Sequence, residues 1–130
     1  MTSVLIVDDA PAVRDSLRRL VSSLPEVDGV SLASSGDEAL ARCLTERPDL
    51  VLLDVRMPGG GGADVFREIR ARYPRLVGRT LFMSGDLSAE MSELVGTGHA
   101  GVLAKPFDLG ALLQTVDEVL AAAARAVEPA

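Results

Sequence analysis

The chain has 130 residues and 48% of them are hydrophobic, which is enough for one domain with a core of its own. It contains no apolar run of about 18 residues and no basic-then-apolar start, so we expect no membrane span, no membrane partner and no signal peptide. The formal net charge of −6 argues against nucleic acid as a direct partner, because nucleic-acid-binding domains usually carry a basic face. A single cysteine, Cys43, excludes an internal disulfide and a cysteine-rich metal site, and it favours a reducing, cytoplasmic setting.

Short apolar runs alternate with helical patterns along the chain. Strands are predicted at residues 4–7, 30–33, 50–53, 80–84 and 101–104. Helices are predicted at residues 11–24, 36–47, 63–72, 88–97 and from 108 onward. This alternation predicts an α/β fold, a doubly wound five-stranded parallel sheet with helices on both faces. We expect residues 1–124 to form the domain and residues 125–130 to be a frayed C-terminal tail.

The second predicted helix has a clear start and an apolar stripe. Ser35 and Glu38 have the spacing of a capping box, in which the two side chains satisfy backbone donors at the helix start. The side chains expected to face the core are Ala39, Leu40, Cys43 and Leu44.

Polar residues stand where the predicted strands end. Asp8 and Asp9 follow the first strand, Asp54 follows the third, Ser84 ends the fourth, and Lys105, the only lysine, follows the fifth. Ligands of open α/β sheets bind at the carboxyl ends of the strands, where the strand order reverses. In the flavodoxin-like order 2-1-3-4-5 the first and third strands are neighbours, so the three aspartates would meet in one crevice.

Three carboxylates in one crevice repel one another, and a divalent cation removes that conflict. Mg²⁺ prefers carboxylate and water oxygens and often completes its shell with phosphate oxygens. A carboxylate can also act as a nucleophile and form an aspartyl phosphate. The phosphoryl oxygens would then be surrounded by the cation, Lys105 and the Ser84 hydroxyl.

The sequence resembles the receiver domains of two-component response regulators, of the chemotaxis-regulator kind, from residue 4 to about residue 120. The resemblance rests on four motifs in order: Asp8-Asp9, Asp54 followed by Met57-Pro58, Ser84, and Lys105-Pro106-Phe107. It implies that Asp54 accepts the phosphoryl group and that Asp8, Asp9, Asp54 and the backbone carbonyl of Arg56 hold Mg²⁺, with Mn²⁺ as a substitute. It further implies that Lys105 pairs with the phosphoryl group, that Ser84 is the switch hydroxyl, that the Gly85 backbone contacts the phosphate, and that the Lys105–Pro106 bond is cis.

The resemblance also implies partners in a phosphorelay. The phosphoryl donor would be a histidine kinase or a histidine phosphotransfer protein, and the phosphorylated chain would bind a downstream protein. A weak homodimer would form through the fourth helix, fifth strand and fifth helix. Such a domain is not an enzyme, although it assists its own phosphorylation and dephosphorylation, and it stands alone or is attached to a hybrid histidine kinase. One position departs from the family, because Val102 stands where a tyrosine or phenylalanine usually lies.

Simpler interpretations and rival functions remain open from the sequence alone. Asp8-Asp9 would also suit the start of a helix, where acidic groups stabilise the helix dipole. Five arginines are expected to form a solvated face, with a docking surface as the alternative: Arg67, Arg70, Arg72, Arg75 and Arg79. One rival is a receiver-like interaction module that acts without phosphorylation. The other is an aspartate-nucleophile phosphohydrolase, which is disfavoured because Arg56 stands where such enzymes carry a second acid.

Overall fold

The sheet has five parallel strands in the order β2-β1-β3-β4-β5, as predicted. The structure is a computed structural model that describes residues 2–57, 61–84, 101–104 and 109–126. The strands are β1 (Thr2–Val7), β2 (Val27–Ala33), β3 (Leu50–Asp54), β4 (Thr80–Ser84) and β5 (Gly101–Ala104). β1 and β3 are hydrogen-bonded neighbours, with Val7 opposite Leu53.

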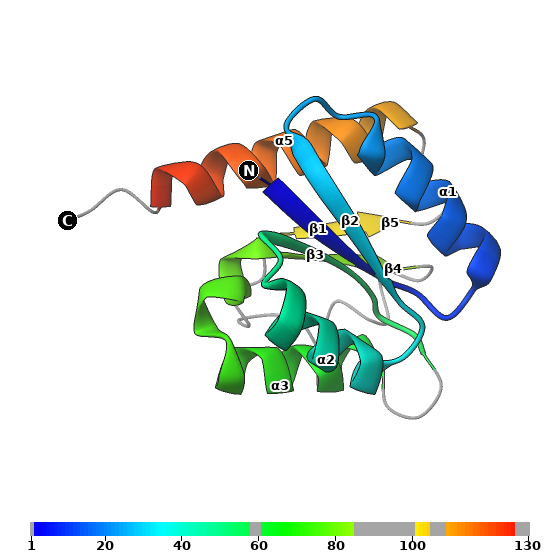
Figure 1. Cartoon of the computed structure of the whole chain (residues 1–130), viewed down its shortest axis with the longest axis vertical. Helices are drawn as coiled ribbons and strands as arrows, with labels where there is room; N and C mark the ends of the chain where they lie inside the picture. Colours follow the sequence, from blue (N-terminus) through cyan, green and yellow to red (C-terminus); the bar gives the residue numbers. More distant parts are fainter. Residues whose placement is uncertain (1, 58–60, 85–100, 105–108, 127–130) are drawn as a thin grey trace.

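Helices cover both faces of this sheet (Figure 1). They are α1 (Pro11–Ser22), α2 (Gly36–Glu46), α3 (Gly62–Arg72) and α5 (Leu109–Ala126), with a 3₁₀ helix, η1 (Pro74–Arg79), after α3. α1 and α5 lie on one face, and α2 and α3 lie on the other (Figure 1). The helix predicted at residues 88–97 lies outside the described residues. No helix in the described part of the chain is both long and apolar enough to cross a bilayer.

Several element boundaries differ from the predicted ones. β2 begins at Val27 because its backbone pairs with Thr2, at the start of β1, although Asp28 interrupts the apolar pattern there. The short helix η1 was not predicted, and it begins at Pro74, which cannot continue an α-helical hydrogen-bond ladder. α5 runs to Ala126, beyond the predicted domain limit at residue 124. That limit stays a prediction.

β3 joins the two halves of the core. All five of its residues are buried, and successive side chains point to opposite faces of the sheet. Val51 and Leu53 belong to the buried cluster that includes Phe66 of α3. Leu50 and Leu52 belong to the buried cluster on the α1–α5 side. An unbroken apolar strand is therefore covered on both faces, as expected for a parallel sheet.

The prediction for Leu44 was wrong. α2 buries Ala39 and Cys43, which lie four residues apart on one stripe, whereas the Leu44 side chain is 65% exposed. Adjacent residues of a helix point in directions about 100° apart, so a narrow buried stripe that includes Cys43 turns Leu44 toward solvent. Burial raises the pKa of the Cys43 thiol to about 11, so this core residue stays neutral.

The orientation of α2 can be tested by substitution. Leu44→Gln should change the free energy of unfolding by less than about 0.5 kcal/mol, because an exposed side chain loses little on replacement. Ile69→Ala, at a fully buried site, should cost about 2–5 kcal/mol. Urea unfolding followed by circular dichroism measures both values. A loss above about 2 kcal/mol for Leu44→Gln would show that this side chain is buried after all.

Candidate functional site

Three aspartates meet at the carboxyl end of the sheet. Asp8 and Asp9 follow β1, and Asp54 is the last residue of β3. Carboxylate oxygens of the three residues all lie within 4.8 Å of one another. Asp8 is fully buried and Asp54 is 5% exposed, whereas Asp9 is exposed to solvent. The predicted convergence of these three side chains is confirmed.

Backbone hydrogen bonds fix the turn that carries Asp8. Its N–H donates to the Ala33 carbonyl at 3.1 Å, and one carboxylate oxygen accepts from the Ala10 N–H at 2.9 Å. The Asp8 carbonyl accepts a hydrogen bond from Arg14 Nη1 at 2.7 Å. Ala10 is the N-cap of α1 and makes no side-chain cap bond, and its N–H is bound by the Asp8 carboxylate, so the acidic pair lies directly before this helix.

Backbone hydrogen bonds also hold the loop after β3. The Arg56 N–H donates to Asp54 Oδ1 at 3.2 Å, and the Val55 N–H donates to the Met83 carbonyl of β4 at 3.0 Å. An open cavity of about 420 Å³ lies beside this loop, and its lining residues are Asp9, Val55, Arg56, Met57 and Gly61. The predicted carbonyl ligand, Arg56, therefore borders the same cavity as Asp9.

Two glycines allow this loop to return close to Asp54. The Gly62 N–H donates to the Val55 carbonyl at 2.7 Å as α3 begins. A Cβ atom on Gly61 would lie 2.7 Å from the Val55 carbonyl oxygen, and one on Gly62 would collide with the Asp54 carbonyl oxygen. Residues 61 and 62 must consequently lack a side chain for Asp54 to keep its position.

The donor set suits a hard divalent cation. Among the described residues, all the gathered donors are carboxylate oxygens, and Cys43 takes no part. Mg²⁺ and Mn²⁺ favour such oxygen ligands. Asp8, Asp9, Asp54 and the Arg56 carbonyl are the groups that would hold the ion.

The remaining predicted site residues are only partly described. β4 ends at Ser84, whose backbone is level with Ala104 of β5, so this residue stands at the same edge of the sheet as Asp54. Gly85, Lys105 and Pro106 lie outside the described residues, and their roles stay predictions. Val102 of β5 is half-buried and packs against the core cluster on the α2–α3 side.

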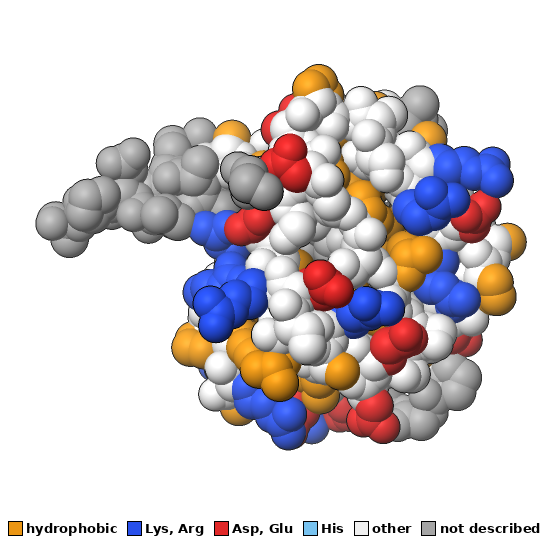
Figure 2. Space-filling view, in the orientation of Figure 1, with side chains coloured by type: hydrophobic (Ala, Val, Ile, Leu, Met, Phe, Trp, Pro, Cys, Tyr) orange, Lys and Arg blue, Asp and Glu red, His pale blue; other side chains and the backbone are white. Residues whose placement is uncertain are grey.

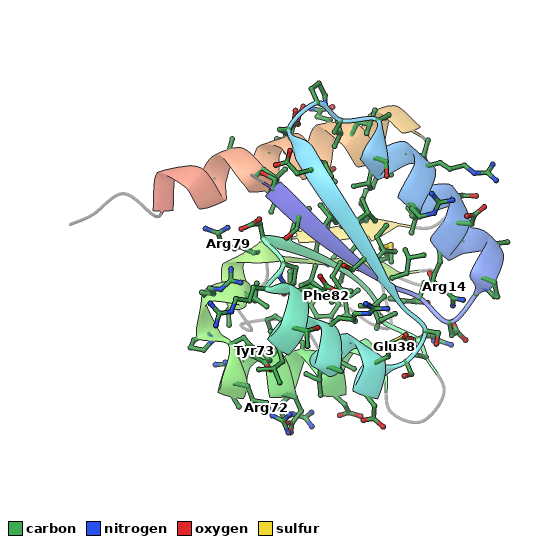
Figure 3. The ribbon with its side chains drawn as sticks, viewed as in Figure 1. Arg14, Glu38, Arg72, Tyr73, Arg79 and Phe82 are labelled. Atoms are coloured by element: carbon green, nitrogen blue, oxygen red, sulfur yellow. The ribbon has the colours of Figure 1, made fainter. Side chains whose placement is uncertain are left out.

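Arg14, which donates to the Asp8 carbonyl, was missed by the sequence analysis, and Glu38 has a partner that differs from the predicted one (Figure 3). The Glu38 N–H donates to Ser35 Oγ at 3.2 Å, as a capping box requires, but the Glu38 carboxylate accepts from the Ser34 N–H at 2.7 Å and not from Ser35. Hydrogen bonds from the Ser34 backbone and hydroxyl, with the charges of Arg42 and Arg14, hold the pKa of Glu38 below its ordinary value. Arg14, six residues after Asp8, leaves no signal in the sequence pattern.

The close approach of α3 to Asp54 predicts a position-specific effect of alanine. Gly62→Ala should lower the free energy of unfolding by about 1–3 kcal/mol, because the new methyl group displaces the backbone of residues 54–55. Gly78→Ala is the matched control, since a Cβ there meets no atom within 4 Å. Urea unfolding of both variants measures the difference, and equal values would contradict the proposed crowding.

The lowered pKa of Glu38 predicts a pH-dependent contribution to stability. A carboxyl group whose pKa is lowered by folding stabilises the fold above its ordinary pKa of 4.5, and this contribution is lost as the pH falls through the folded value. Glu38→Gln should therefore cost about 0.5–1 kcal/mol at neutral pH and less near pH 3. Denaturant unfolding of both proteins across this range measures it. A cost that is independent of pH would show that the Glu38 charge does not matter.

Comparison with known proteins identifies a matching family and several curated relatives of the chain. The family described as response regulator receiver domain matches residues 4–117. The chain is 37% identical over 120 residues to the DNA-binding transcriptional activator DevR/DosR of Mycobacterium tuberculosis, covering 92% of this chain and 54% of that protein. It is 32% identical over 123 residues to the response regulator GacA of Pseudomonas viridiflava, covering 93% and 56%. The chain thus spans about half the length of these curated relatives.

Solved structures share the fold. A LuxR-family two-component response regulator from Aurantimonas sp. SI85-9A1 superimposes with a TM-score of 0.83 at 31% identity, over 94% of this chain and 87% of that one. The chemotaxis protein CheY4 of Vibrio cholerae also gives a TM-score of 0.83, at 29% identity, over 92% and 98%. Both matches extend over nearly all of this chain.

Proposed function

Because the chain belongs to the family of response regulator receiver domains, we propose that it accepts a phosphoryl group on Asp54 while Mg²⁺, or Mn²⁺ in its place, is bound beside it. The observation that carries this proposal is the gathering of three carboxylates within 4.8 Å at the end of β1 and β3. Like charges so close are costly without a cation, and an acidic cation site next to a carboxylate nucleophile suits phosphoryl transfer.

In the proposed reaction a carboxylate oxygen of Asp54 attacks the phosphorus atom of the donor. The new bond joins that oxygen to phosphorus, and the bond from phosphorus to the donor nitrogen or oxygen breaks, with its electron pair leaving on the donor. The Arg56 N–H, hydrogen-bonded to Oδ1, holds the carboxylate in a fixed orientation. Asp8 and Asp9 would hold the cation, which when bound neutralises charge on the phosphoryl oxygens. Lys105 and Ser84 are the further groups expected to stabilise those oxygens.

Family membership supports a place in two-component signalling for the chain. The proposed donor is a phosphohistidine on a histidine kinase or a histidine phosphotransfer protein. The proposed output is altered binding of a downstream protein, or of a second copy through the predicted fourth helix, β5 and α5. We propose no enzyme activity beyond assistance to its own phosphorylation and dephosphorylation. Some relatives have further activities, such as a protein-glutamate methylesterase from Syntrophus aciditrophicus, of which this chain covers only 29%.

Phosphorylation of Asp54 can be tested directly by intact-mass spectrometry. Incubation with acetyl phosphate and Mg²⁺ should add one phosphoryl group to the protein, and omission of Mg²⁺ should abolish the addition. Asp54→Asn should remain unmodified, because an amide cannot supply the nucleophilic oxygen. Asp64→Asn, at an exposed carboxylate of α3, is the control and should be modified like the wild type.

Labelling of the Asp54→Asn protein would defeat the assignment of the acceptor. No labelling of the wild type by acetyl phosphate or by a phosphorylated histidine phosphotransfer protein would favour the rival function, an interaction module that acts without phosphorylation.

A further inference from the structure

Charge is distributed unevenly along the chain. Residues 62–79, which form α3 and η1, hold five arginines and two acidic residues, a formal charge of +3. The rest of the chain holds eight basic and seventeen acidic residues, a formal charge of −9, which together give the net charge of −6. α3 and η1 are therefore a basic region of a protein that is acidic as a whole, whereas α2 itself carries one arginine and three acidic residues.

The basic region lies at the opposite end of the sheet from the aspartates. α2 and α3 each follow a strand and run back along the sheet, so their C-terminal ends lie near the amino ends of the strands (Figure 1). In the space-filling view, basic side chains border hydrophobic ones on this side of the molecule (Figure 2). Arg67, Arg70, Arg72 and Arg75 are exposed, as predicted. Arg79 is not, since its side chain is only 17% exposed and lies 3.8 Å from an Asp49 oxygen.

We name four residues at this end of the sheet the α2–η1 surface: Leu44, Arg47, Tyr73 and Arg75. Leu44 lies in the last turn of α2, and Arg47 is the C-cap that ends this helix. Arg75 lies near enough to Cys43, the neighbour of Leu44, for its charge to act on that thiol. Tyr73 is half-buried and packs against the core cluster that contains Cys43.

Leu44 is the one large hydrophobic side chain that is exposed among the described residues. A single exposed leucine is ordinary on a protein surface. This leucine, however, stands between Arg42 and Arg47 in the sequence, and its exposure follows from the helix orientation that buries Cys43. It offers an apolar contact close to the end of α2, beside the Arg47 C-cap.

Arg47 has an unusual backbone conformation. Its φ of 47° and ψ of 62° place it in the left-handed region, and it is the single non-glycine residue of the described chain with positive φ. Glycine is the usual residue at this position after a helix, and a residue with a side chain costs about 1–2 kcal/mol there. The chain thus carries an arginine where glycine would be easier to accommodate, directly before Pro48. An exposed, strained residue of this kind points to a role outside folding.

We propose that the α2–η1 surface is a docking site for an acidic amphipathic segment of a partner protein. The apolar side chains of that segment would cover Leu44 and Tyr73, and its carboxylates would pair with Arg47 and Arg75. A nucleic acid fits less well, because it brings no apolar side chain for Leu44, which is 65% exposed. The proposal is independent of phosphorylation at Asp54.

The docking site can be tested with a synthetic peptide that forms an amphipathic helix, with leucines on one side and glutamates on the other. Titration into the ¹⁵N-labelled full chain should shift the amide signals of the α2–η1 surface, and fluorescence anisotropy gives the affinity. Arg75→Gln and Leu44→Gln should each weaken binding about fivefold, which corresponds to about 1 kcal/mol. Arg19→Gln, at an exposed arginine of α1, is the matched control and should bind as the wild type does.

Arg47→Gly separates function from folding. It should weaken peptide binding by a similar factor while the midpoint of urea unfolding stays unchanged or rises, because glycine accepts the left-handed conformation. Four results would overturn the proposal: no binding of the acidic peptide, equal weakening by Arg19→Gln, wild-type binding by Arg47→Gly, or tighter binding of a lysine-substituted peptide. Tighter binding of a short DNA duplex at the same amides would assign the surface to nucleic acid instead.

Discussion

The packing of three carboxylates at the ends of β1 and β3 is the constraint on which the rest of the structure depends. Carboxylate oxygens that lie within 4.8 Å of one another repel when they are ionised. The charges stay together because β1 and β3 are paired in the centre of the sheet and their apolar residues are fully buried. The buried apolar residues of β1 and β3 therefore hold the carboxylates together against their repulsion.

The loops around the site are specified by backbone contacts more than by side chains. Asp8 is fixed through hydrogen bonds with Ala33 and Ala10, and Asp54 through one with the Arg56 N–H. Gly62 is needed because any side chain there would collide with the Asp54 carbonyl. These contacts leave the carboxylates in a fixed arrangement before any ligand arrives. Pre-arranged charges are effective in catalysis because they need no reorganisation when the reaction occurs.

The sequence pattern was sufficient for the strand order and the acidic site, since both follow from local signals. Apolar runs of four or five residues identify the strands, and an aspartate at the end of such a run must lie at the carboxyl edge. The orientation of Leu44 could not be predicted this way. Leu40, Cys43 and Leu44 are all apolar, and only the packing of α2 against α3 decides which of them turns outward. Arg14 was missed for a related reason, because a long side chain reaches a carbonyl group that no periodicity indicates.

The separation of the acidic and basic ends of the sheet has a consequence for signalling. β3 has five residues and so spans roughly 16 Å at about 3.3 Å per residue. This exceeds the Debye length of about 8 Å at physiological salt, so salt screens the part of any interaction between the two ends that passes through solvent. The two ends are also connected by packing, because Leu53, Phe66 of α3 and Cys43 of α2 belong to one buried cluster. Val102 packs against this same cluster, so the residue that departs from the family pattern contacts the buried residues that connect the two ends of the sheet.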